Sequence, residues 1–314
     1  MKHLAPVVLF LLSVLYSHAQ VEYPYPVRTI PVMLENKMVQ MAFMDVKPDN
    51  AHQTVLLLHG KNFNGYYWKE VMSFLEKEGI RVVAPDQPGW GKSDKPDLHY
   101  SFHMLAQATR ILLDSLQVDK AVVVGHSMGG MLATRFALLY PERVEKLVLE
   151  NPIGLEDYRR FVPWQPLERL YEKEKEATYE SVKQYQQTYY PEWREEYEQY
   201  VLAQAEAIRK PDYNRVAWVN ALTYQMIYEQ TVCYEWDRLS MPVLLIIGQE
   251  DRTVVGKAYL SEADKLKYGQ YPELGKKTHQ QITDARLVEL PGVGHIPHIQ
   301  SLSEFQLYLM DFIK

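Results

Sequence analysis

The chain has almost no cysteine: Cys233 is the only one among 314 residues. A single cysteine cannot form a disulfide within the chain, so the fold must depend on a large hydrophobic core. A cysteine nucleophile needs a partner histidine in a recognisable local pattern, and none accompanies Cys233. We therefore expect Cys233 to be a small buried apolar residue.

The sequence also has no excess of positive charge. Lys and Arg number 34 against 40 Asp and Glu, which gives a net charge of −6. Because no basic stripe is available to neutralise phosphates, we expect no nucleic-acid partner. With 47% hydrophobic and 24% charged residues, the composition is that of an ordinary globular protein.

Metal and cofactor signatures are absent as well. No cluster of His, Cys and Asp has the spacing of metal ligands. No glycine-rich loop opens a helix in the pattern that binds dinucleotides or phosphates. The sequence therefore predicts a protein that uses no metal and no cofactor.

The amino terminus carries an apolar run, Leu4–Tyr16, that is too short to span a bilayer, which needs about 20 apolar residues. Lys2 precedes the run, and the small residues Ser17 and Ala19 follow it. This pattern predicts a signal peptide over residues 1–19, cut after Ala19, and a secreted or periplasmic protein with no stable membrane span. The alternative is an uncleaved anchor or a buried first helix.

The rest of the chain alternates β-rich apolar runs with helical patterns. Many of the runs are apolar throughout, as expected of parallel strands that are covered on both faces. This alternation predicts an α/β fold with a mostly parallel, eight-stranded sheet flanked by helices. The expected strands are Thr29–Leu34, Lys37–Val46, Thr54–Leu58, Arg81–Ala84, Ala121–Val124, Lys146–Leu149, Val243–Ile247 and Arg286–Leu290.

The alternation stops between Gly154 and Asp237, where no strand pattern occurs. Three helical patterns lie there instead, around Val182–Tyr189, Trp193–Ile208 and Val216–Met226, and the segment holds twelve of the 23 tyrosines. Such an insert sits over the carboxyl ends of the strands, where open α/β sheets bind ligands. We expect a helical lid over 155–237 on a core formed by 20–154 and 238–314. The Glu/Lys run from Glu168 to Glu180 is expected to be a solvated face.

A strand, a sharp turn and a helix meet at Gly125-His126-Ser127-Met128-Gly129. This Gly-x-Ser-x-Gly pattern in that context predicts a nucleophile elbow that presents the Ser127 hydroxyl. Gly125 and Gly129 must lack a Cβ because strand and helix approach closely at the turn.

A serine hydroxyl needs a base, and the base needs a partner that holds its tautomer. The loop after Val243–Ile247 supplies Asp251, and the loop after Arg286–Leu290 supplies His295. Both loops should open at the same sheet edge as Ser127, so we expect a Ser127–His295–Asp251 triad. His298 is the rival base and Glu250 the rival acid.

The oxyanion of such a reaction needs fixed donors. We expect the backbone N–H of Met128, at the start of the helix after the elbow, to be one of them. The other is expected from Lys61, since Gly60 allows the backbone to turn this amide toward the site. His59 is expected to brace the loop, and the sequence leaves open whether the Lys61 side chain faces solvent or substrate.

Taken together, these motifs resemble those of the lidded α/β-hydrolases with a His-Gly oxyanion loop, over about residues 25–314. The resemblance implies that Ser127, Asp251 and His295 form the triad, that the amides of Lys61 and Met128 form the oxyanion hole, and that the chain is a cofactor-free hydrolase. Relatives that act on epoxides or haloalkanes carry aspartate where this chain has Ser127, so those activities are not expected. The matching motifs are His59-Gly60, the turn Asp86–Ser93, Gly125–Gly130, Gly248–Asp251 and Gly294–Pro297.

Within that family we expect a small-molecule substrate, namely a small to medium carboxylic ester cleaved through an acyl-enzyme. The alternatives are an aminopeptidase or iminopeptidase, a C–C bond hydrolase, and a non-catalytic binding protein on the same scaffold. One departure from the family pattern is the long polar segment Lys257–Thr278. It either edges the pocket or lies on the surface.

Overall fold

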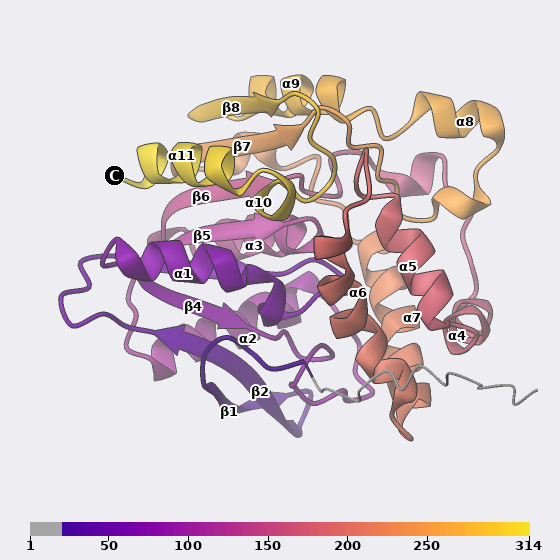
Figure 1. Cartoon of the computed structure of the whole chain (residues 1–314), viewed down its shortest axis with the longest axis horizontal. Coiled ribbons are helices and arrows are strands. Elements are labelled where there is room, and N and C mark those ends of the chain that lie inside the picture. The colour runs from indigo at the N-terminus through magenta and orange to yellow at the C-terminus, as the bar shows by residue number, and fades with distance from the viewer. Residues whose placement is uncertain (1–20) are drawn as a thin grey trace, which may run out of the picture.

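The computed structural model describes residues 21–314, and the predicted signal peptide lies outside them. Its centre is an eight-stranded sheet in the order β1-β2-β4-β3-β5-β6-β7-β8 (Figure 1). All eight expected strands are present, with ends that differ by at most two residues. They are β1 Val27–Leu34, β2 Lys37–Val46, β3 Thr54–Leu58, β4 Arg81–Pro85, β5 Ala121–His126, β6 Val144–Glu150, β7 Val243–Gly248 and β8 Ala285–Leu290.

The sheet is mostly parallel, as predicted. Strands β4, β3, β5, β6, β7 and β8 pair in parallel, and β2 pairs antiparallel with both β1 and β4. The β1–β2 hairpin turns at Glu35 and Asn36, whose φ angles are 45° and 62°. Two successive positive φ values are typical of the tight turn whose twist matches that of the strands.

Helices cover both faces of the sheet, which explains why its central strands are apolar throughout. Helices α1 (Lys69–Lys77) and α11 (Leu302–Ile313) form one core with Val122 and Val124 of β5. Helices α2 (Phe102–Ser115) and α3 (Met128–Leu139) form the other core with Val123. Successive residues of β5 are therefore buried on opposite faces.

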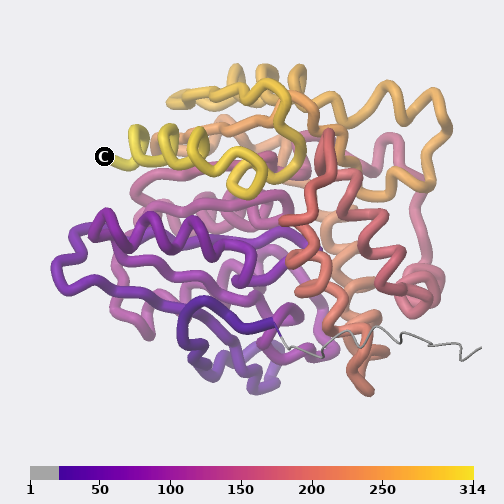
Figure 2. The backbone as a smooth tube through the Cα atoms, viewed as in Figure 1, coloured from indigo at the N-terminus to yellow at the C-terminus, as the bar shows by residue number. Residues whose placement is uncertain are grey.

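The segment between β6 and β7 is helical and packs at one end of the sheet (Figures 1 and 2). We call this segment, residues 151–242, the insert. Three of its helices match the predicted patterns, and α4 was missed. The run that contains α4 is not only a solvated face, because Leu170 is buried and the Tyr171 ring lies 5.3 Å from that of Trp218. The helices are α4 Leu167–Lys175, α5 Tyr179–Gln187, α6 Glu198–Ala205 and α7 Tyr213–Glu229.

The polar segment Lys257–Thr278 forms α8 (Glu262–Lys267) and most of α9 (Tyr271–Gln281). Leu266 of α8 is exposed to solvent, whereas Tyr271 of α9 is buried and donates a hydrogen bond to the carbonyl of Pro152. One part of the segment is thus at the surface and the other packs on the core. Across residues 21–314, no helix combines the length and the apolar character that a membrane crossing requires.

Candidate active site

Ser127 lies at the turn between β5 and α3, with φ 56° and ψ −121°. This conformation is strained for a residue with a side chain. A Cβ at Gly125 would lie 2.3 Å from the carbonyl oxygen of Gly129, and a Cβ at Gly129 would lie 2.0 Å from that of Leu58. Only glycine fits at both positions, which confirms the predicted reason for these residues.

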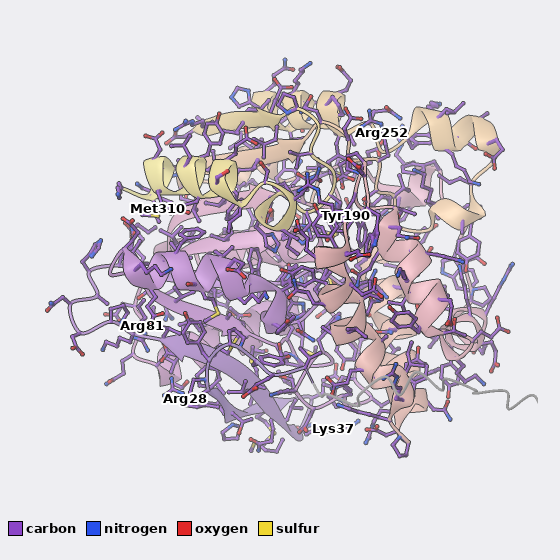
Figure 3. The ribbon with its side chains drawn as sticks, viewed as in Figure 1. Arg28, Lys37, Arg81, Tyr190, Arg252 and Met310 are labelled. Atoms are coloured by element: carbon purple, nitrogen blue, oxygen red, sulfur yellow. The ribbon has the colours of Figure 1, made fainter. Side chains whose placement is uncertain are left out.

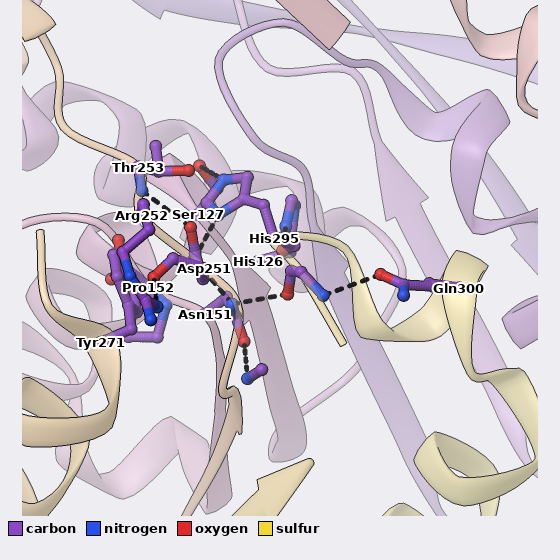
Figure 4. Close-up of polar contacts among 12 residues, drawn as sticks. His126, Ser127, Asn151, Pro152, Asp251, Arg252, Thr253, Tyr271, His295 and Gln300 are labelled. Carbon is purple, nitrogen blue, oxygen red and sulfur yellow. Dashed lines mark hydrogen bonds and ion pairs between the residues drawn. The ribbon is translucent and has the colours of Figure 1, made fainter. Parts of the chain in front are cut away.

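The three predicted triad residues lie in one hydrogen-bonded chain (Figure 4). His295 Nε2 is 3.0 Å from Ser127 Oγ, and His295 Nδ1 is 2.7 Å from Asp251 Oδ2. An ionised carboxylate only accepts, so Nδ1 carries the proton and Nε2 accepts from the Ser127 hydroxyl. All three side chains are buried. The arrangement can move a proton from the hydroxyl to the imidazole, and the catalytic roles themselves stay predictions.

Asp251 is held by more than His295. Its Oδ1 accepts the backbone N–H of Thr253 at 2.8 Å, and its Oδ2 also accepts Asn151 Nδ2 at 2.7 Å. Burial by itself would raise the pKa of Asp251, but the electrostatic interaction with the His295 ring and these hydrogen bonds outweigh it and lower the pKa. The carboxylate therefore stays ionised and available to stabilise an imidazolium.

Asn151 is a site residue that the sequence analysis missed. Besides Asp251, its Nδ2 donates to the carbonyl of Gly294 at 3.0 Å, and its Oδ1 accepts the N–H of Gly248 at 2.8 Å. One buried side chain thus links the loops after β7 and β8. Asn151 directly follows β6 at the sheet edge where the other site residues lie, and this position is the signal that could have found it.

The two rival residues lie elsewhere. His298 Nδ1 is 2.9 Å from the buried carboxylate of Glu150, and its ring stacks on Trp68 with centroids 4.1 Å apart. The His298 ring therefore contacts Glu150 and Trp68 and not Ser127. Glu250 is exposed, and His295 contacts Asp251 instead. The geometry favours His295 and Asp251.

A second hydrogen-bonded chain joins the loop after β3 (residues 59–63, the β3 loop) to the loop after β8 (residues 291–296, the β8 loop). The N–H of Gly60 donates to Tyr67 Oη at 2.9 Å, and this hydroxyl lies 3.0 Å from His126 Nδ1. His126 Nε2 lies 2.8 Å from the carbonyl of His295. Since a carbonyl only accepts, Nε2 donates, and Nδ1 accepts from Tyr67. His126, next to the elbow serine, therefore fixes both loops.

The β3 loop contacts the elbow directly. A Cβ at Gly60 would lie 3.1 Å from Ser127 Cβ, so the backbone before Lys61 runs beside the serine. His59 braces the loop as predicted: its Nδ1 lies 2.8 Å from the carbonyl of Gly60, and its Nε2 accepts the N–H of Gln87. The Lys61 side chain is largely buried, with Nζ 3.8 Å from Glu174 of α4. Within residues 21–314, no acceptor is bonded to the backbone N–H of Lys61 or of Met128.

Cys233 has no place at this site. The expected full burial of Cys233 is wrong: the residue is only partly buried, and its sulfur lies 3.0 Å from Thr231 Oγ1. Burial raises the pKa of the thiol, which disfavours the nucleophilic thiolate. In the part of the chain that the structure describes, no three His, Cys, Asp or Glu side chains are grouped to hold a metal ion. That the reaction uses no metal and no cofactor stays a prediction.

The buried His126 predicts a pH dependence of stability. Burial lowers its pKa to about 3 from 6.5, so between these values an unfolded chain binds a proton that the folded protein excludes. The free energy of unfolding therefore falls as the pH is lowered through this window. Urea unfolding at several pH values measures this dependence. Between about pH 4 and pH 6, we expect His126→Gln to reduce the slope of the free energy of unfolding against pH by ~1.4 kcal/mol per pH unit.

Glu150 has the opposite effect, because burial raises its pKa to about 7 and the folded protein then binds the extra proton. Because both groups contribute to the wild-type slope, the effect of His126 is taken from the difference between the slopes of His126→Gln and the wild type. Equal slopes in the two proteins would show that His126 is not held neutral by burial.

Comparison with known proteins agrees with this fold. The chain is similar to a probable hydrolytic enzyme from Pseudomonas aeruginosa PAO1, with 45% identity, a TM-score of 0.91, and coverage of 93% of this chain and 96% of that one. It is 28% identical to the 2-hydroxy-6-oxo-6-phenylhexa-2,4-dienoate hydrolase of Comamonas testosteroni, over 83% of this chain and 88% of the relative. An enol-lactonase from Burkholderia xenovorans LB400 shares the fold at 21% identity and a TM-score of 0.69, with coverage of 88% of this chain and 96% of the lactonase.

These findings support a hydrolytic enzyme. The model of the family described as alpha/beta hydrolase fold matches residues 53–302, and the chain belongs to this family.

Proposed function

We propose that the protein is a serine hydrolase that cleaves carboxylic esters through an acyl-enzyme. The observation that carries the proposal is the chain of hydrogen bonds from Ser127 Oγ through His295 to Asp251. A hydroxyl bonded to a neutral imidazole, itself bonded to a buried carboxylate, is the arrangement that makes serine nucleophilic.

In the first half-reaction, Ser127 Oγ attacks the ester carbonyl while His295 Nε2 takes its proton. The carbonyl electrons move to the oxygen, and Asp251 stabilises the imidazolium. Collapse of the tetrahedral intermediate breaks the bond to the alcohol oxygen, which leaves with the proton from His295. In the second half-reaction, His295 Nε2 takes a proton from water as the water oxygen attacks the acyl carbon. The bond between the acyl carbon and Ser127 Oγ then breaks, His295 returns the proton to Oγ, and the carboxylic acid is released.

The negative charge on the carbonyl oxygen needs donors that do not move. The backbone N–H groups of Lys61 and Met128 suit this role, since both flank Ser127 and neither is bonded to an acceptor in residues 21–314. The N–H of Met128 also lies at the amino end of α3, where the helix favours negative charge.

We expect Lys61→Pro to lower kcat by ~10²- to 10³-fold, because proline has no N–H to donate. Lys61→Ala is the reference for this loss: it breaks the same contact with Glu174 but keeps the N–H. Steady-state kinetics on one ester measures both. Equal losses in the two variants would mean that the Lys61 amide does not bind the oxyanion.

The many aromatic residues of the insert support a substrate of small to medium size with an apolar group. The position of the insert at one end of the sheet supports the role of a lid over 155–237. A cavity of about 110 Å³ lies between core and insert. Its lining is mixed: Phe63, Trp90 and Val216 are apolar, whereas Lys95 and Glu206 are charged, and no triad residue is among the lining residues. Hydrolysis of a C–C bond is the second candidate, because the 28% identical relative is named as a dienoate hydrolase.

The Leu4–Tyr16 run and the small residues at Ser17 and Ala19 support secretion or export to the periplasm after cleavage behind Ala19. Amino-terminal sequencing of the protein recovered from its native compartment tests this directly.

A substrate panel tests the proposed function. We expect short-chain nitrophenyl esters to be hydrolysed, with lower activity on prolyl nitroanilides. Turnover of a dienoate with no turnover of any ester would select the C–C hydrolase instead. Cleavage of prolyl chromogens alone would select the iminopeptidase.

A further inference from the structure

Tyr189 connects the insert to the β8 loop through the backbone. It follows α5, and its carbonyl accepts the N–H of His295 at 2.7 Å. A Cβ at Gly294 would lie 2.2 Å from this carbonyl oxygen and 2.9 Å from Pro191 Cδ. Gly294 is therefore required by the close approach of the insert. The neighbouring Tyr190 marks this junction in Figure 3.

The side chain of Tyr189 also contacts both the proposed base and the β3 loop. Its ring stacks on the imidazole of His295, with centroids 4.8 Å apart and an angle of 28° between the planes. Its hydroxyl accepts Asn62 Nδ2 at 2.8 Å. Asn62 directly follows Lys61 in the β3 loop. One buried residue of the insert thus touches the proposed base and the proposed oxyanion loop.

These contacts restrict movements that matter for the reaction. The stacked Tyr189 ring limits rotation of the His295 imidazole away from Ser127 Oγ. The Tyr189 hydroxyl, through Asn62, limits displacement of the β3 loop. A displacement of about 1 Å in a catalytic group can cost ~10²-fold in rate. Gln186, one turn earlier, is itself fixed by bonds to Tyr200 and Gln204 of α6, so Tyr189 is held by two helices of the insert.

We infer that Tyr189 is a positioning residue through which the insert sets the His295 ring and the β3 loop relative to Ser127. The insert is then part of the catalytic geometry as well as a wall of the pocket. This inference rests on the proposed serine hydrolase function.

The hydrogen bond between Tyr189 and Asn62 can be broken from either side. We expect Tyr189→Phe and Asn62→Ala each to lower kcat for an ester by about 10-fold with little change in KM, because the contact orients catalytic groups and not substrate. The double variant should be no slower than either single variant, since both remove the same interaction. Thermal midpoints are measured on the same samples to separate positioning from folding.

Tyr190→Phe is the matched control. Tyr190 is also buried in the insert, but its hydroxyl has no partner in residues 21–314. The kcat of Tyr190→Phe should equal that of the wild type. The inference is overturned if Tyr189→Phe matches Tyr190→Phe, or if the double variant loses the product of the two single losses. Absence of ester turnover in the wild type, or full turnover by Ser127→Ala, would instead refute the proposed function.

Discussion

Ser127→Ala is expected to lower ester turnover by ~10⁶-fold, leaving only what binding and the oxyanion donors contribute. The substitution removes the one oxygen that His295 Nε2 contacts at 3.0 Å. Alanine keeps the Cβ and adds no bulk, so the elbow with φ 56° at this position carries no new strain. Because the backbone is preserved, the thermal midpoint should stay close to that of the wild type.

Steady-state hydrolysis of a nitrophenyl ester, with purified variants made in parallel, measures this loss. Ser93 provides the control, since Ser93→Ala changes a buried serine that bonds to the Asp86 carbonyl and lacks the elbow. Equal turnover by Ser127→Ala and wild type would show that Ser127 is not the nucleophile.

His295→Asn is expected to reduce kcat about as strongly as Ser127→Ala, because serine and histidine act as one unit. The amide of Asn can still donate toward Asp251, as Nδ1 does, but it has no nitrogen that accepts the Ser127 proton. The same substitution at His298 is expected to have little effect on kcat. There Asn can donate to Glu150 in place of Nδ1, and no contact with Ser127 is lost.

We therefore expect His298→Asn to retain ester turnover within a few-fold while its free energy of unfolding falls by about 1–3 kcal/mol through lost stacking on Trp68. Activity assays and urea unfolding on the pair measure the two effects. The assignment of the base fails if His298→Asn loses more activity than His295→Asn.

The strands were predictable because the physics that forms them is local. In β5, a β-branched run buried on both faces leaves a signal in every residue, and Gly125 and Gly129 mark the turn that follows. Since parallel strands end at one edge of a sheet, the loops that carry Asp251 and His295 could be expected to meet Ser127. The structure brings these three residues within hydrogen-bond distance.

The residues that the sequence did not reveal act through long-range packing. Asn151 bonds to Asp251, Gly294 and Gly248, contacts that depend on how three loops stack. The need for glycine at Gly294 depends on the insert, because a Cβ there would lie 2.2 Å from the carbonyl oxygen of Tyr189. Helix α4 has a single buried leucine, Leu170, among charged residues, so its apolar periodicity is too weak to read.

Covalent labelling tests the central claim most directly. The purified protein is treated with a fluorophosphonate, and the adduct is located by intact mass and peptide mapping. We predict one phosphonyl group per chain, on Ser127, with much slower labelling in His295→Asn because the hydroxyl loses its base. A phosphonyl group on any other residue, or labelling of Ser127 at the same rate without His295, would contradict the account.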